Sequence, residues 1–182
     1  DIYFDELAEP VAADELDAAV KARFGDHRGF ELALPEVLEQ LGYSRGDAEF
    51  LGRRVRVEIA KGAGHAMRPA LPEYGAWLRT NSLEGELGWD GFDTAMHELG
   101  HNLEQLCSTH FGPRPVLRGV PNTACTEAFA FLYQGLAASV LHLPESDPQT
   151  AADTHCCERL LDAAQIAGPA LLEIHVWRWI YD

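Results

Sequence analysis

Positive charge is scarce in this chain. Lysine and arginine together number 14 against 29 aspartates and glutamates, which gives a formal net charge of -15, and Lys21 and Lys61 are its only lysines. Proteins that bind nucleic acid need a basic surface that neutralises phosphates, and attraction to an anionic membrane depends on a surface of the same kind. The charge balance therefore argues against nucleic acid and against a membrane as partners.

Long apolar runs and a cysteine framework are missing as well. No segment approaches the roughly 18 consecutive apolar residues of a transmembrane helix, and the first residues, DIYFD, show neither the basic nor the apolar region of a signal peptide. The four cysteines include an adjacent pair, Cys156 and Cys157, which suits a disulfide framework poorly. Reduced thiols and a cytoplasmic location are therefore expected.

The remaining composition is that of an ordinary globular protein. The 182 residues are 47% apolar and 24% charged, so we expect one domain over 1–182 with its own core. Alternation over 53–60 predicts a half-buried strand with Val55, Val57 and Ile59 inward. The other predicted elements are a helix over 13–24, a short helix over 35–42, a glycine loop over 61–69, a strand over 76–81 and helices over 91–109, 122–142, 148–165 and 169–181. Two strands followed by a run of helices are typical of an α+β fold that is predominantly α.

The motif His97-Glu98-Leu99-Gly100-His101 carries the most specific chemical signal. Two histidines four residues apart project from one helix face, close enough to bind a single zinc ion. Glu98 projects beside the metal, where it can take a proton from a zinc-bound water. The helix has an apolar face of its own, formed by Met96, Leu99, Leu103 and Leu106. That face distinguishes it from an ordinary solvated helix.

The third zinc ligand is expected on a second helix. Glu127 lies in an otherwise apolar helical run, where a carboxylate without a partner is costly to bury and a bound cation removes that cost. Glu104 is the rival, but it shares the helix of the histidines and is more readily explained as a solvated residue. Glu104 and Cys107 stand where a metzincin has glycine and histidine, which excludes that class. Asp93, four residues before His97, can accept a hydrogen bond from a ligand histidine or simply favour the helix N-terminus.

Four segments occur in a characteristic order: a glycine loop at Gly62–Ala66, a strand ending in asparagine at Trp77–Asn81, the zinc helix at Thr94–His101 and a glutamate segment at Ala124–Ala128. Glu127 follows His101 by 26 positions. Over residues 50–140 the chain therefore resembles the thimet oligopeptidase and oligoendopeptidase F family of gluzincin metallopeptidases.

The resemblance implies a zincin-like catalytic domain, with a small sheet and an edge strand packed on the zinc helix. It implies that His97, His101 and Glu127 hold one Zn²⁺ and that Glu98 is the general base in the hydrolysis of short peptides. The strand carrying Trp77, Arg79 and Asn81 would be an edge strand that pairs with the substrate backbone. His65, in the glycine loop, is a further candidate for substrate contact.

The chain also departs from that family. Family members are several times longer, and nothing here matches their downstream segment that stabilises the oxyanion, so we expect the catalytic core of a longer protein or a reduced relative. Trp177 and Trp179 would cover a face left open by missing helical segments, or would promote self-association. Two alternatives remain: a carboxypeptidase similar to the Taq carboxypeptidase family, whose His-Glu-Ser signature is replaced here by Cys125-Thr-Glu127, and a zinc-stabilised module with weak or no turnover.

Overall fold

The computed structural model describes residues 12–81, 86–112, 116, 122–143 and 148–182. Contacts within the chain separate it into two units, one spanning Val11–Leu143 and the other combining Asp1–Pro10 with Pro144–Asp182. Each unit is described by itself. The single catalytic domain expected over 1–182 stays a prediction.

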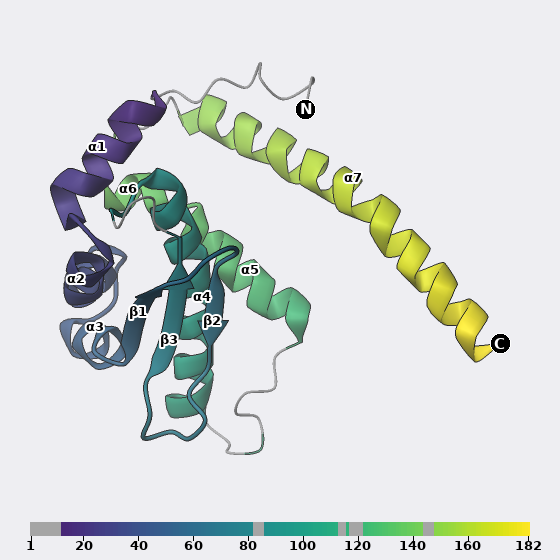
Figure 1. Ribbon diagram of the computed structural model, residues 1–182, viewed down its shortest axis with the longest axis horizontal. Coiled ribbons are helices and arrows are strands. Elements are labelled where there is room, and N and C mark those ends of the chain that lie inside the picture. Colours follow the sequence, from purple (N-terminus) through teal and green to yellow (C-terminus); the bar gives the residue numbers. More distant parts are fainter. Residues whose placement is uncertain (1–11, 82–85, 113–115, 117–121, 144–147) are drawn as a thin grey trace. The chain divides into compact units, whose positions relative to one another are not determined.

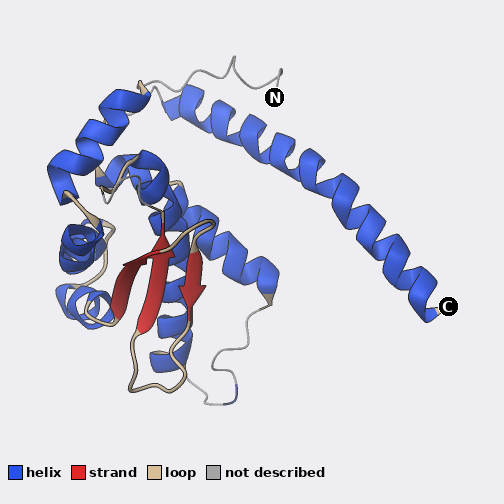
Figure 2. Cartoon of the chain, in the orientation of Figure 1, coloured by secondary structure: helices blue, strands red, loops and turns tan. Residues whose placement is uncertain are grey.

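A three-stranded sheet lies at the centre of the larger unit (Figure 2). Its strands are β1 (Val55–Ile59), β2 (His65–Met67) and β3 (Ala76–Thr80), in the order β1-β3-β2. β3 is parallel to β1 and antiparallel to β2. The predicted alternation is confirmed in β1, where Val55 and Val57 are buried, and β3 buries Ala76, Leu78 and Thr80.

The prediction that Trp77–Asn81 is an edge strand is wrong. β3 has neighbours on both sides, and the edge belongs to β2, which lies within the segment predicted as a glycine loop. Three residues give too short an alternation to be recognised beside glycines. The fold is nevertheless α+β and mostly helical, as predicted.

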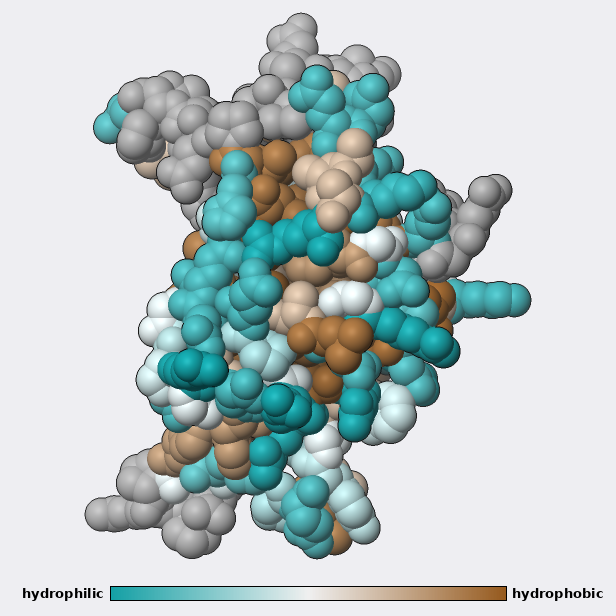
Figure 3. Space-filling view, turned by 90° about the vertical axis from the view of Figure 1, so that its left-hand side faces the viewer, coloured by the Kyte–Doolittle hydropathy of each residue, from teal (hydrophilic) through white to brown (hydrophobic). Residues whose placement is uncertain are grey.

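Helices of the larger unit lie behind one face of this sheet and beside β1, and among the described residues the other face is open (Figure 2). These helices are α1 (Ala13–Phe24), α2 (His27–Gln40), α3 (Arg45–Gly52), α4 (Trp89–His110), α5 (Thr123–Gln134) and α6 (Ala137–Val140). α4 contacts β2 and β3 on one side and α5 on another, while α2 contacts β1 (Figure 1). The core between them includes an aromatic cluster, in which the rings of Phe24, Phe30 and Phe92 have centroids 5.2–5.5 Å apart. Seen from the side of α1–α3, the unit presents mainly hydrophilic residues with smaller hydrophobic areas between them (Figure 3).

Four of the predicted helices differ from those observed. α2 begins eight residues before Pro35, because the Asp26 side chain caps its N-terminus by accepting a 2.8 Å hydrogen bond from the Gly29 N–H. The predicted helix over 122–142 is interrupted between α5 and α6. The predicted break at Gly168-Pro169 is absent, since α7 (Pro148–Tyr181) is one helix with Pro169 inside it.

α7 belongs to the smaller unit and carries many exposed apolar side chains. They include Leu160, Ile166, Leu171, Leu172, Ile174, Val176, Trp177, Trp179, Ile180 and Tyr181. The Trp177 and Tyr181 rings stack, with centroids 5.7 Å apart. Self-association through this helix stays a prediction. In the described part of the chain, no helix has the length and apolar character needed to span a membrane.

Candidate metal centre

The candidate site lies where α4 packs closely against α5. Gly100 makes this approach possible: a Cβ atom built on it would lie 2.7 Å from Ala130 Cα and 2.7 Å from the Phe129 carbonyl oxygen. Carbon atoms do not come that close without displacement, so residue 100 must lack a side chain. Gly100 lies between His97 and His101 along α4, and this contact brings the face carrying both histidines against α5.

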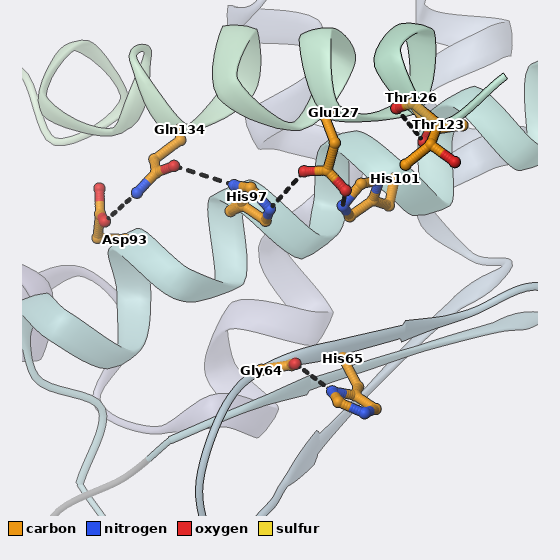
Figure 4. Close-up of polar contacts among 9 residues, drawn as sticks. All are labelled: Gly64, His65, Asp93, His97, His101, Thr123, Thr126, Glu127 and Gln134. Atoms are coloured by element: carbon orange, nitrogen blue, oxygen red, sulfur yellow. Dashed lines mark hydrogen bonds and ion pairs between the residues drawn. The ribbon is translucent and has the colours of Figure 1, made fainter. Parts of the chain in front are cut away.

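Three potential metal ligands meet at this contact (Figure 4). His97 Nε2 lies 3.7 Å from Glu127 Oε2, and His101 Nε2 lies 3.6 Å from Glu127 Oε1. One ligand atom from each residue lies within 4.8 Å of the others. Atoms bound about 2.0–2.1 Å from a tetrahedral zinc are about 3.3 Å apart, so small side-chain adjustments would complete the geometry. Two imidazole nitrogens and one carboxylate are a donor set typical of catalytic zinc.

Gln134 controls the orientation of His97. The Gln134 amide nitrogen donates to Asp93 Oδ2 at 2.6 Å, and His97 Nδ1 lies 3.0 Å from the Gln134 amide oxygen. Because an ionised Asp93 only accepts hydrogen bonds, the Gln134 amide oxygen must face His97. His97 Nδ1 then carries the proton and donates it, which leaves the Nε2 lone pair directed towards Glu127.

This arrangement corrects the prediction for Asp93. The hydrogen-bond link from Asp93 to His97 runs through Gln134, which lies between the two side chains. Burial raises the pKa of Asp93, while the hydrogen bond from Gln134 opposes that shift. Gln134 was missed in the sequence, although it follows Glu127 by seven residues and therefore lies two helical turns away on the same face of α5.

Glu98 is enclosed by the edge strand. Its side chain is buried, and a Cβ atom built on Gly64 would lie 3.0 Å from Glu98 Oε1 and 2.4 Å from Thr94 Cγ2. Burial raises the pKa of Glu98; the nearby His97 and His65 and the backbone N–H of Ala66 lower it. A buried carboxylate beside the ligand cluster is suited to proton transfer.

The residues predicted to contact substrate are not gathered at this cluster. Trp77 and Arg79 alternate with buried Ala76 and Leu78, so they occupy the face of the sheet opposite α4. Arg79 pairs there with Glu58 at 3.2 Å.

His65 and Asn81 also lie apart from the ligand cluster. His65 is exposed on β2, and its ring points away from the α4 histidines (Figure 4). Asn81 lies beside Gly91, where a Cβ atom would be 2.4 Å from the Asn81 carbonyl oxygen. Gly91 is six residues before His97, about 9 Å along the helix axis.

Phe131 and Glu104 are two further side chains of α5 and α4 to consider beside the ligands. Phe131 is 43% exposed, and its ring centroid lies 5.2 Å from that of His97, so it forms an apolar wall beside the ligands. Glu104, the rival ligand, is buried on α4, and burial raises its pKa. Among the described residues, Glu104 does not belong to the group whose ligand atoms lie together.

Comparisons with protein-family models, curated proteins and solved structures find no match. The family resemblance therefore stays a prediction.

Gly100→Ala is expected to separate α4 from α5. The added methyl group would meet the α5 backbone, so we expect the free energy of unfolding to fall by about 1–3 kcal/mol and zinc affinity to weaken. Gly46→Ala is the matched control, because a Cβ atom there meets nothing within 4 Å. Denaturant unfolding and zinc titration would check both variants. Equal stability and equal zinc affinity in Gly100→Ala would contradict the proposed close contact.

Gln134→Leu is expected to weaken zinc binding about 10- to 100-fold, because His97 would lose the acceptor that fixes its tautomer. Gln134→Glu would place a second carboxylate against Asp93. Adding Asp93→Asn supplies an amide N–H that can donate to the new carboxylate at position 134. That carboxylate can then still accept from His97, so the double variant should recover most of the zinc affinity. Competition with a chromophoric chelator measures all of these affinities. Unchanged zinc affinity in Gln134→Leu would exclude the orienting role.

Proposed function

We propose that this chain is a zinc-dependent peptidase acting on short peptides. His97, His101 and Glu127 would hold the metal, and Glu98 would act as general base. The observation that carries the proposal is the convergence of three ligand atoms from two helices within 4.8 Å, with a buried carboxylate next to the first histidine. The negative charge of the chain and the HExxH motif are compatible with this reading.

A zinc ion held by His97, His101 and Glu127 would polarise the scissile carbonyl and lower the pKa of a bound water. The Glu98 carboxylate would take a proton from the attacking water and deliver it to the nitrogen of the leaving amine. Burial of Glu98 supports this role, because a raised pKa brings a carboxylate closer to the pKa that a general acid and base needs near neutral pH.

The edge strand supports an extended peptide as substrate. Among the described residues β2 pairs only with β3, and the Ala66 N–H of β2 donates to Glu98, so a peptide added to the outer edge of β2 would lie beside this carboxylate. An extended peptide could add to that edge by main-chain hydrogen bonds, which read the backbone with little sequence preference. We therefore propose substrate pairing at β2 instead of at the strand Trp77–Asn81 that the sequence suggested.

Metal content is the first test. Protein purified without added metal should contain about one zinc per chain by elemental mass spectrometry. It should cleave quenched fluorescent peptides, lose activity with a chelator and regain it with added zinc. Absence of zinc even after reconstitution would overturn the proposal.

The cleavage products distinguish the proposal from its alternatives. Internal cleavage supports an oligopeptidase, whereas release of single C-terminal residues would identify a carboxypeptidase. Bound zinc without hydrolysis of any peptide would leave a structural zinc module.

A further inference from the structure

A recess lined by arginines lies on the sheet face away from the metal ligands. Arg53, Arg54 and Arg56 line one side, and Glu73–Gly75 with Trp77 line the other. Arg56 and Trp77 are register partners on β1 and β3, and both alternate with buried residues. Their side chains therefore point away from α4, so the recess is distinct from the candidate metal centre.

The backbone holds the two sides of this recess together. The Ala76 N–H donates to the Arg54 carbonyl oxygen at 2.7 Å. A Cβ atom built on Gly75 would lie 2.6 Å from the same oxygen, so a larger residue there would separate the sides. The start of β3 is therefore fixed directly beside the arginines.

Two of the arginines are paired with carboxylates and one is not. Arg53 contacts Glu49 at 2.5 Å, and Arg56 contacts Glu31 at 2.7 Å. None of the ion pairs among the described residues includes Arg54. In a chain with 14 basic and 29 acidic residues, three arginines within residues 53–56 form a local concentration of positive charge.

Arg54 is held in place by Phe50. Its guanidinium carbon lies 3.7 Å from the centroid of the Phe50 ring, and Nη1 donates to the Phe50 carbonyl oxygen at 3.2 Å. Stacking fixes the plane of the guanidinium. Only one of its five N–H groups is used by this carbonyl, so a fork of donors remains for the two oxygens of a phosphate or carboxylate.

The opposite side of the recess supplies aromatic surface. Trp77 is 41% exposed and Tyr74 is 56% exposed. A positive charge near a helix C-terminus is favourable, which explains why Arg53 lies at the end of α3 and why Arg54 donates to the Phe50 carbonyl oxygen. It does not account for Arg56, which lies on β1, or for two exposed aromatic residues beside it.

We propose that this recess binds a small organic anion with an oxyanion group attached to a planar ring. Arg54 and Arg56 would hold the oxyanion, a phosphate or a carboxylate, and the ring would lie against Trp77. Glu73 is the one carboxylate in the lining and disfavours ligands of high negative charge. The proposal does not depend on the metal centre or on peptidase activity.

Calorimetric titration with four probes tests the proposal. Adenosine monophosphate joins a phosphate to a ring, indole-3-acetate joins a carboxylate to a ring, adenosine lacks the oxyanion and inorganic phosphate lacks the ring. At least one of the first two should bind about tenfold more tightly than adenosine and inorganic phosphate, with affinity that falls as salt rises. Which of the two binds identifies the oxyanion. Failure of both to bind, or equal binding of adenosine, would overturn the proposal.

Variants locate the binding site. Arg54→Met should weaken binding about tenfold or more. Arg56→Met, at an exposed position that does not contact Phe50, should also weaken it and guards against a folding defect in the first variant. Arg45→Met removes the same charge from the other end of α3 and should bind like the wild type. Affinity that is unchanged in Arg54→Met and Arg56→Met would place the anion elsewhere, the metal centre included, and would overturn the proposal.

Discussion

Glu98→Gln is expected to retain zinc and to lose about 10³-fold in peptide hydrolysis. Glutamine has nearly the shape of glutamate and fits the space beside Gly64, but it cannot take a proton from water. Since Glu98 is not one of the three clustered ligands, its replacement should leave metal binding intact. Elemental mass spectrometry would give the zinc content, and a quenched peptide would give kcat/KM.

Glu104→Gln is the matched control for that variant. Glu104 is also a buried glutamate on α4 whose pKa is raised by burial, but it lies outside the ligand group. Its replacement should preserve most of the activity. Full activity in Glu98→Gln would exclude Glu98 as the general base, and equal losses in both variants would indicate a structural effect of buried carboxylates.

Zinc is expected to stabilise the larger unit, and Glu127→Ala is expected to abolish that stabilisation. Glu127 is the sole ligand from α5, so a bound ion would tie α5 to α4. A ligand present at about 1,000 times its dissociation constant stabilises the folded state by about 4 kcal/mol. For a unit of this size, that corresponds to a rise in melting temperature on the order of 10 °C.

Thermal unfolding with and without added zinc measures this effect. The wild type should gain stability with zinc, whereas Glu127→Ala should not respond to zinc. Glu39→Ala removes an exposed glutamate from α2 and should respond like the wild type. A full zinc response in Glu127→Ala would show that Glu127 is not a ligand.

The sequence predicted the parts of the fold that have a regular hydrophobic period. β1 and α4 have such periods over enough residues, and both were located within about two residues. α3 was missed because its eight residues carry few apolar positions, and β2 because three residues give no period. Continuity of α7 through Pro169 was not predicted, since proline usually ends or kinks a helix.

The residues of the candidate site likewise fall into those that the sequence predicted and those that it did not. His97 and His101 follow from helical spacing alone, and Glu127 was found because a carboxylate in an apolar run needs a partner. Spacing places Gln134 on the same helix face as Glu127 but does not show that it contacts His97, and the edge position of β2 has no such signal at all. Both depend on how segments distant in sequence are placed against each other; the small Gly100 indicates close packing at that point of α4, but the sequence does not say that α5 is the partner.

The close contact of α4 with α5 has a consequence for when the proposed activity could arise. His101 and Glu127 are separated by 26 positions and come from different helices, so the three-ligand group exists only after these helices have docked. Before docking, α4 can offer zinc the two histidines on its own face but not the full set. Under the proposed function the chain would therefore become a hydrolase only once it had folded, and nascent copies would pose no proteolytic risk to one another.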